Sequence, residues 1–248
     1  MRASSPVHSV GMSPKAIFFD MDDTLLDGIT AMQASWDAVC ADEAPGLGCD
    51  PVFLREVIRR ESALFWKDEA AVGHWRIRLE DARIHVLGIA FAKEGLDASR
   101  VEPIGRRYTV EHRERVQLFD DSIATLEALR SGGYKIGLLT NGPAEMQREK
   151  IARFDLARLM DVMVIEGEFG RGKPDPAVFL HALETVGVDP GDAWHIGDNL
   201  FADVAGAQSV GVHGVWIHRD RLKLGDEPHA VPDRVIGHLD ELRAALDL

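Results

Sequence analysis

The stretch KAIFFDMDDT, residues 15–24, places a short apolar run directly before a cluster of acidic residues. Residues 15–19 have the length and composition of a buried strand. Asp20 and Asp22 follow, two residues apart, at the point where that strand would end. Ligand sites in open α/β sheets lie at such carboxyl ends. Two carboxylates held this close repel each other, and a divalent cation is a common way to compensate their charge. For this stretch alone, an acidic turn without chemistry remains an alternative, because Asp favours turns.

The chain alternates between strand and helix patterns after residue 117. Such alternation predicts a sheet of parallel strands with crossover helices on both faces, and therefore an α/β fold. The strand before Asp20 belongs to this sheet, although its partners lie about a hundred residues downstream. The expected further strands are residues 134–140, 161–166, 193–197 and 213–217, and the expected helices are 121–130, 144–154, 176–186, 199–209 and 238–246.

The segment between these parts, residues 28–117, has only helical patterns. Ser99 and Glu102 have the spacing of a capping box, which predicts the start of the last of its helices. We therefore expect a discontinuous catalytic core of residues 14–27 and 118–248, a helical cap inserted at 28–117, and a disordered extension at 1–13. The expected helices of the cap are residues 29–41, 51–66, 74–87 and 99–113.

Composition narrows the classes of function. The 248 residues are 46% hydrophobic, and no apolar run approaches the roughly 18 residues of a membrane span. Two cysteines, Cys40 and Cys49, give no disulfide framework, so a reducing cytoplasm is the expected compartment. The net charge of −13 argues against binding to nucleic acid or to an anionic membrane. The sequence does not distinguish a monomer from a homodimer.

Polar residues also follow three of the later expected strands. Thr140-Asn141-Gly142 lies at the end of the first of these strands, just before an expected helix. A hydroxyl and an amide at the start of a helix are suited to bind a phosphate oxygen. Lys173 lies between Gly172 and Pro174, and Asp198 ends a further strand, five residues before Asp203. Taken alone, each of these groups is compatible with an ordinary turn. Lys173 taken alone is also compatible with a solvated position on the surface.

Together, in this order and spacing, the four stretches resemble the haloacid dehalogenase superfamily of hydrolases. The resemblance covers residues 15 to about 217 and implies a Rossmann-like core, an aspartyl nucleophile and Mg²⁺ as cofactor. The run LTNG at 139–142, followed by QREKI at 147–151, is similar to the N-acylneuraminate-9-phosphatase subgroup and its pyrimidine-nucleotidase neighbours.

The resemblance assigns the catalytic roles to three residues. Asp20 attacks phosphorus, because carboxylates act as nucleophiles through aspartyl-phosphate intermediates. Asp22 protonates the leaving oxygen and then activates water. Lys173 balances charge in the transition state and contacts the phosphoryl group.

The remaining candidates hold the phosphate, the metal or these residues. Thr140 and Asn141 are expected to bind phosphoryl oxygens. Mg²⁺ is expected to be held by Asp20, the backbone carbonyl of Asp22, and Asp198. Asp203 is expected to orient Lys173 or a metal-bound water. Thr24 and Asn199 complete the set as supporting residues.

The identity of Asp22 separates reactions within the superfamily, since its dehalogenases have an uncharged residue there. A carboxylate fits an oxygen leaving group, which needs a proton. We therefore predict a Mg²⁺-dependent phosphatase acting on a small phosphorylated metabolite, such as a sugar phosphate or nucleoside monophosphate. A phosphomutase is the alternative, followed by a haloacid dehalogenase or a non-catalytic binding protein.

Overall fold

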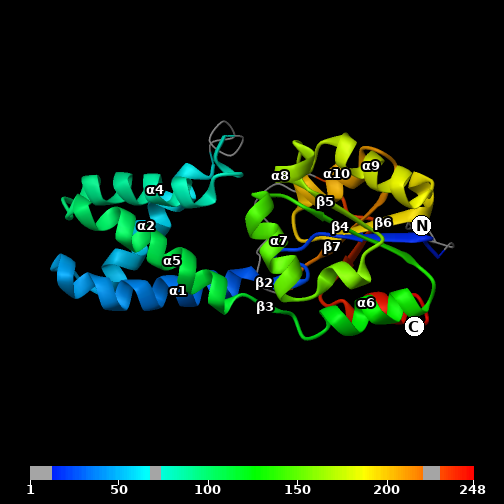
Figure 1. Cartoon of the computed structure of the whole chain (residues 1–248), viewed down its shortest axis with the longest axis horizontal. Helices are drawn as coiled ribbons and strands as arrows, with labels where there is room; N and C mark the ends of the chain where they lie inside the picture. Colours follow the sequence, from blue (N-terminus) through cyan, green and yellow to red (C-terminus); the bar gives the residue numbers. More distant parts are fainter. Residues whose placement is uncertain (1–12, 68–73, 220–229) are drawn as a thin grey trace, which may run out of the picture.

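The computed structural model describes residues 13–67, 74–219 and 230–248. The expected N-terminal extension lies outside these residues except for residue 13. A sheet flanked by helices forms one part of the molecule, and a group of helices forms the other (Figure 1). Within the described residues, no helix has the length and apolar character needed to cross a membrane.

The sheet has six strands in the order β5-β4-β1-β6-β7-β8, and all its pairings are parallel. From β1 the chain goes to β4 and outward to β5, then returns to β6 on the other side of β1. Such a reversal of strand order creates a crevice at the carboxyl ends of the central strands. The strands are β1 (Ala16–Phe19), β4 (Lys135–Thr140), β5 (Val162–Ile165), β6 (Ala193–Gly197), β7 (His213–Ile217) and β8 (Arg234–Ile236).

Alternating side chains of β1 enter two separate apolar cores, because successive residues of a strand face opposite sides of the sheet. Ile17 and Phe19 pack with α6 (Ser122–Ser131), α7 (Ala144–Arg153) and α11 (Asp240–Ala245). Ala16 and Phe18 pack with α9 (Pro176–Val186) and α10 (Gly206–Gln208). Helices therefore cover both faces, which confirms the predicted α/β class.

The helices of the other part, here called the helical region, surround a core of their own. Trp36, Leu54, Phe91 and Ile104 are among its buried residues. The two chain crossings that join it to the sheet pair as a short antiparallel ribbon of β2 (Leu26–Asp27) and β3 (Gln117–Leu118). The helices are α1 (Gly28–Glu43), α2 (Pro51–Phe65), α4 (Leu79–Glu94) and α5 (Val101–Arg115).

Two local predictions were wrong, and a third differs in detail. The helix expected at 74–87 is interrupted: His74 and Trp75 are helical, residues 76–78 are not, and α4 runs from Leu79 to Glu94. The capping box at Ser99 is absent: the Asp97 carboxylate caps a short 3₁₀ turn there, and α5 begins at Val101 without a side-chain cap. The helix expected at 199–209 is present, although its first part, Leu200–Ala205, is π-helical and only its end, Gly206–Gln208, is α-helical. Strands β2, β3 and β8 have only two or three residues, too few for a period-2 pattern.

Candidate active site

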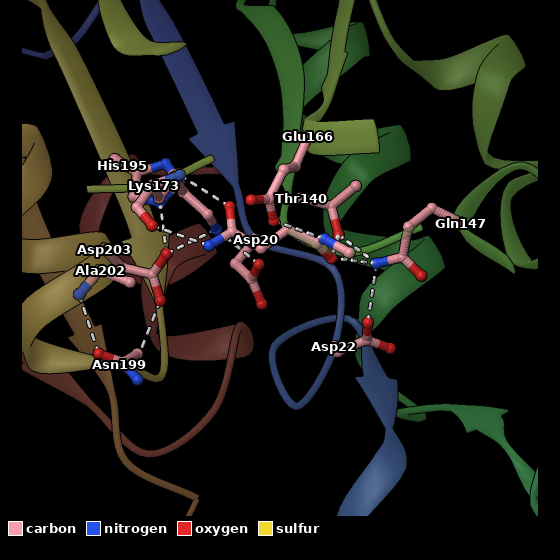
Figure 2. Close-up of polar contacts among 12 residues, drawn as sticks. Asp20, Asp22, Thr140, Gln147, Glu166, Lys173, His195, Asn199, Ala202 and Asp203 are labelled. Atoms are coloured by element: carbon pink, nitrogen blue, oxygen red, sulfur yellow. Dashed lines mark hydrogen bonds and ion pairs between the residues drawn. The ribbon is translucent and has the colours of Figure 1, made fainter. Parts of the chain in front are cut away.

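The carboxyl ends of β1, β4 and β6 bring most of the candidate residues together. In Figure 2, Asp20 lies between Lys173 and Asp203 on one side and Thr140 and Gln147 on the other. Its neighbours come from three separate segments of the chain: Thr140 and Gln147 from the end of β4 and the helix after it, Lys173 from the loop region after β5, and Asp203 from the turn after β6. The site is therefore assembled by the sheet topology rather than by one continuous motif.

Lys173 is a buried cation fixed between two carboxylates. Its Nζ atom lies 2.6 Å from Asp20 Oδ1 and 2.6 Å from Asp203 Oδ1, and the residue is 2% exposed. Burial lowers the pKa of Lys173, but Asp20 and Asp203 outweigh it and raise the pKa above its ordinary value. The ammonium group is therefore held charged beside Asp20.

Both carboxylate oxygens of Asp203 contact neighbouring groups. Besides Lys173, Oδ1 lies 3.0 Å from Nε2 of the fully buried His195, and Oδ2 accepts a hydrogen bond of 3.0 Å from the backbone N–H of Asn199. Burial raises the pKa of Asp203, but Lys173 and His195 hold it well below its usual range. A Cβ atom at Gly197 would lie 2.2 Å from Asp203 Cγ, so only glycine leaves room for this carboxylate.

Asp198 and Asp20 are the carboxylates best suited to a cation. Among the described residues, the Asp198 side chain has no hydrogen-bond or ion-pair partner. Burial raises its pKa well above the usual value, and Asp20 and Asp203 add to the effect. Burial also raises the pKa of Asp20 to about 7, although Lys173 opposes the shift. Ligand atoms of Asp20, Asp198 and Asp203 all lie within 4.8 Å of one another.

This donor set fits a hard divalent cation, which takes oxygen ligands and would relieve the repulsion that raises these pKa values. Asp203 already binds Lys173, His195 and Asn199, so Asp20 and Asp198 retain more capacity to coordinate.

The Asp22 side chain points toward α7 rather than toward Lys173 (Figure 2). Its two carboxylate oxygens lie 2.7 and 2.9 Å from Lys150 Nζ, and Gln147 Nε2 donates to one of them at 3.0 Å. Burial raises the pKa of Asp22, but Lys150 and Gln147 more than offset this and lower it. Asp22 is thus an ion-paired carboxylate in this arrangement.

The loop after β4 is tied to its neighbours by side-chain amides. Gln147 Nε2 lies 2.6 Å from Thr140 Oγ1 and 2.8 Å from the carbonyl oxygen of Asn141. The Asn141 amide donates to the carbonyl of Lys173 at 2.8 Å and accepts from its N–H at 2.7 Å. The Asn141 side chain therefore positions the Lys173 backbone.

A buried carboxylate on α8 (Glu166–Phe169) also borders this loop. Glu166 is 5% exposed and accepts a hydrogen bond of 3.0 Å from the N–H of Gly142. Its ion-pair partner is Arg76 of the segment before α4, with Arg76 Nε 2.5 Å from Glu166 Oε1. This pair links the helical region to the candidate site.

Among the described residues, the side chains of Asn199 and Thr24, the two further supporting residues, form no hydrogen bond with another candidate side chain. Asn199 caps the π-helical turn, since its side chain accepts from the N–H groups of Phe201 and Ala202. The buried Thr24 hydroxyl has no hydrogen-bond partner among the described residues, and the Thr24 carbonyl accepts from Arg219 at 2.9 Å.

Sequence reasoning missed four side chains of this site, namely Gln147, Lys150, Glu166 and His195. Gln147 and Lys150 belong to the QREKI run, which was used only as a sign of ancestry. His195 is a polar residue inside an apolar strand, and that contrast was the one available signal for it. No sequence pattern marks Glu166.

Comparison with known proteins agrees with this geometry. A family model described as haloacid dehalogenase-like hydrolase matches residues 14–211. Phosphoserine phosphatase of Thermus thermophilus is 34% identical, over 92% of this chain and 97% of its own. N-acylneuraminate-9-phosphatase of Mus musculus is 29% identical, over 94% and 93% respectively.

A solved structure, a HAD phosphatase of Thermococcus onnurineus, aligns with a TM-score of 0.64 and 32% identity, covering 94% of this chain and 97% of the other. The family model spans most of the chain, and its first matched residues include the β1 strand and the acidic residues that follow it. This chain therefore belongs to the haloacid dehalogenase-like hydrolase family.

Proposed function

We propose that the protein is a Mg²⁺-dependent phosphatase that hydrolyses a small phosphorylated metabolite through an aspartyl-phosphate intermediate. The observation that carries the proposal is the Asp20 carboxylate at the end of β1, 2.6 Å from a buried ammonium group. A second carboxylate, Asp22, lies two residues further on, and its side chain is paired with Lys150 rather than with Lys173. Phosphoryl transfer needs these three elements: a nucleophile, positive charge on the phosphoryl group, and a group that exchanges a proton.

In the first half-reaction, an Asp20 oxygen forms a bond to phosphorus while the bond from phosphorus to the leaving oxygen breaks. Lys173 stabilises the negative charge on the phosphoryl oxygens, and Asp203, itself in contact with His195, holds the ammonium group in place. Thr140 contributes a hydroxyl at the phosphate, whereas Asn141 acts mainly through the backbone of Lys173.

Asp22 exchanges the proton with the leaving alcohol and with water. Lys150 keeps it ionised before substrate binds, and the charge of an incoming phosphate raises its pKa so that it can carry a proton. After the alcohol has left, the Asp22 carboxylate accepts a proton from water as the water attacks phosphorus, and the bond between phosphorus and the Asp20 oxygen breaks, which releases phosphate and regenerates the Asp20 carboxylate.

Asp20, the backbone carbonyl of Asp22, and Asp198 would hold the Mg²⁺ ion. When bound, the ion supplies positive charge that reduces the repulsion between the nucleophile and the phosphate.

We assign substrate selection to the helical region, treating residues 28–117 as a cap over a core of 14–27 and 118–248. The substrate class is a sugar phosphate, a nucleoside monophosphate or a similar small phosphate ester, in keeping with relatives named for phosphoserine and N-acylneuraminate 9-phosphate. The free cysteines Cys40 and Cys49 support a cytoplasmic location.

A panel of phosphorylated metabolites, together with p-nitrophenyl phosphate, tests this proposal. Free phosphate is measured with Mg²⁺ and with EDTA, and halide release from 2-haloacids is measured in parallel. We expect phosphate release that depends on Mg²⁺ and no halide release. Transfer of phosphate between positions of one sugar, without net release, would instead indicate a phosphomutase.

A further inference from the structure

A cavity of ≈ 240 Å³ lies between the helical region and α7. Arg83 of α4 and Thr109 and His112 of α5 line one side, and Met146 and Lys150 of α7 line the other. Because the two sides belong to different parts of the fold, the cavity has the location expected for the non-reacting part of a substrate. We call it the Arg83 cavity.

Arg83 is a rigidly held guanidinium group with unused donors. One N–H group donates to Thr109 Oγ1 at 2.6 Å, and Cζ lies 4.3 Å from the centroid of the Tyr108 ring. The Tyr108 ring is itself stacked on Trp36, with centroids 4.1 Å apart. Among the described residues, no carboxylate lies within ion-pair distance of Arg83. A guanidinium has five N–H donors, so most of those on Arg83 are available to a ligand.

The other charged groups of the cavity do not neutralise Arg83. Arg113 pairs with Glu149, and Lys150 pairs with Asp22. Glu80 and Glu145 also line the cavity but form no ion pair with Arg83. Arg153 also lines the cavity and donates to the backbone carbonyls of Arg113 and Glu114. Among the described residues, Arg83 and Arg153 are thus the lining cations without a carboxylate partner, in a chain whose net charge is −13.

The Arg83 cavity is adjacent to the side of the reaction centre where the leaving group departs. Lys150 lines the cavity and also contacts both carboxylate oxygens of Asp22, at 2.7 and 2.9 Å. In the proposed mechanism Asp22 exchanges its proton with the leaving oxygen. The carbon skeleton attached to that oxygen would therefore extend past Asp22 and Lys150 toward Arg83.

We propose that Arg83 binds a carboxylate carried by the substrate, so that the enzyme selects phosphate esters of hydroxy acids or amino acids. This inference rests on the proposed function and specifies its substrate class. A carboxylate matches the planar donor arrangement of a guanidinium and accepts two parallel hydrogen bonds from it. The stacked Tyr108 ring and the Thr109 hydroxyl fix the guanidinium orientation in advance, which reduces the entropy lost on binding.

Pairs of substrates that differ in one carboxylate test the proposal directly. O-phospho-L-serine is compared with O-phosphoethanolamine, and 6-phosphogluconate with sorbitol 6-phosphate, by kcat/KM with Mg²⁺. The wild type, Arg83→Met and Arg83→Lys are measured, with Arg106→Met as the control. Arg106 is an exposed residue of α5 whose ion pair with Glu102 lies outside the cavity.

We expect the wild type to prefer the carboxylate member of at least one pair by tenfold or more. Arg83→Met should remove that preference, mainly through KM, whereas Arg83→Lys should retain part of it and Arg106→Met all of it. The ratio within a pair is independent of the folded fraction of a variant, so partial misfolding cannot imitate the result. Absence of the preference in the wild type, or its persistence in Arg83→Met, would overturn the proposal.

A preference for fructose 1,6-bisphosphate over fructose 6-phosphate, without one for carboxylates, would also overturn the carboxylate assignment. The proposed function fails separately, if neither p-nitrophenyl phosphate nor any member of the pairs is hydrolysed.

Discussion

Replacement of Lys173 by methionine tests how strongly one ammonium group holds the acidic site together. The substitution keeps an unbranched side chain but removes the charge that lies 2.6 Å from both Asp20 and Asp203. Asp203 would then be a buried carboxylate facing other acids, with His195 as its remaining side-chain partner. Breaking a buried ion pair by removing one partner costs about 3–5 kcal/mol.

A second estimate of the stability lost in Lys173→Met comes from the free energy of protonating Asp203. Without Lys173, Asp203 can avoid its buried charge by taking up a proton. At pH 7.5, protonating a group with an ordinary pKa of about 3.9 costs about 5 kcal/mol, since each pKa unit corresponds to about 1.4 kcal/mol. At pH 5.5 the same step costs about 2 kcal/mol. The two estimates agree on several kcal/mol at neutral pH.

The sign of the pH dependence follows from linkage. In the wild type Lys173 and His195 lower the pKa of Asp203, so this group contributes stability that is lost only in strong acid. In the variant the folded-state pKa is raised above the unfolded value, so the native state binds more protons than the unfolded state. The free energy of unfolding then falls as pH rises from about 4 toward the new pKa. The difference between wild type and variant should therefore grow between pH 5.5 and pH 7.5.

The assay is urea unfolding in EDTA at both pH values, with Lys15→Met as a matched control. Lys15 also lies 2.6 Å from a carboxylate, that of Asp192, but its side chain is 68% exposed. Exposed pairs contribute little, so we expect no resolvable loss in the control. A loss for Lys173→Met below about 1 kcal/mol, or one equal at the two pH values, would refute the reasoning.

Three further outcomes are expected. EDTA should abolish turnover and Mg²⁺ should restore it; activity that persists in the metal-free protein would contradict the role given to Asp198. Lys150→Met removes the charge that lowers the pKa of Asp22, so the acidic limb of the pH profile of kcat, which reports Asp22 as the base that activates water, should shift to higher pH by about one unit or more. Arg148→Met, at an exposed residue of the same helix that pairs with Glu168, should leave the profile unchanged, and an unshifted profile in Lys150→Met would contradict the role given to this ion pair. Burial, assisted by Lys150 and Arg83, lowers the pKa of His112 to about 4. Below about pH 6.5 the unfolded state therefore binds a proton that the folded state does not, and the free energy of unfolding decreases as the pH is lowered. His112→Gln should remove up to about 2 kcal/mol of the stability lost between pH 7.5 and pH 5, and an unchanged loss in the variant would rule out this cause.

The sheet and its strand-end residues could be predicted because their signals are local. An apolar run followed by Asp20 identifies β1, and the alternation after residue 117 gives the other long strands. Parallel strands share one edge for their carboxyl ends, so Lys173 and Asp198 could be placed near Asp20 before any contact was known.

The partners of these residues could not be predicted, because they depend on side-chain directions across the fold. Lys150 contacts Asp22 from 128 residues away, and Gln147 from 125. Asn141 illustrates the same difficulty within a correct motif: its position at a strand end was foreseen, but its amide binds the Lys173 backbone. The pair of Arg76 and Glu166 depends on how the helical region meets the sheet, which no local pattern encodes.

Trapping the covalent intermediate on Asp20 tests the central claim most directly. The protein is mixed with a ³²P-labelled substrate and Mg²⁺, quenched in acid within one turnover, and digested. We predict a hydroxylamine-sensitive label on the peptide that contains Asp20, and neither label nor turnover in a folded Asp20→Asn variant. Turnover by Asp20→Asn, or a label on another residue, would contradict the account.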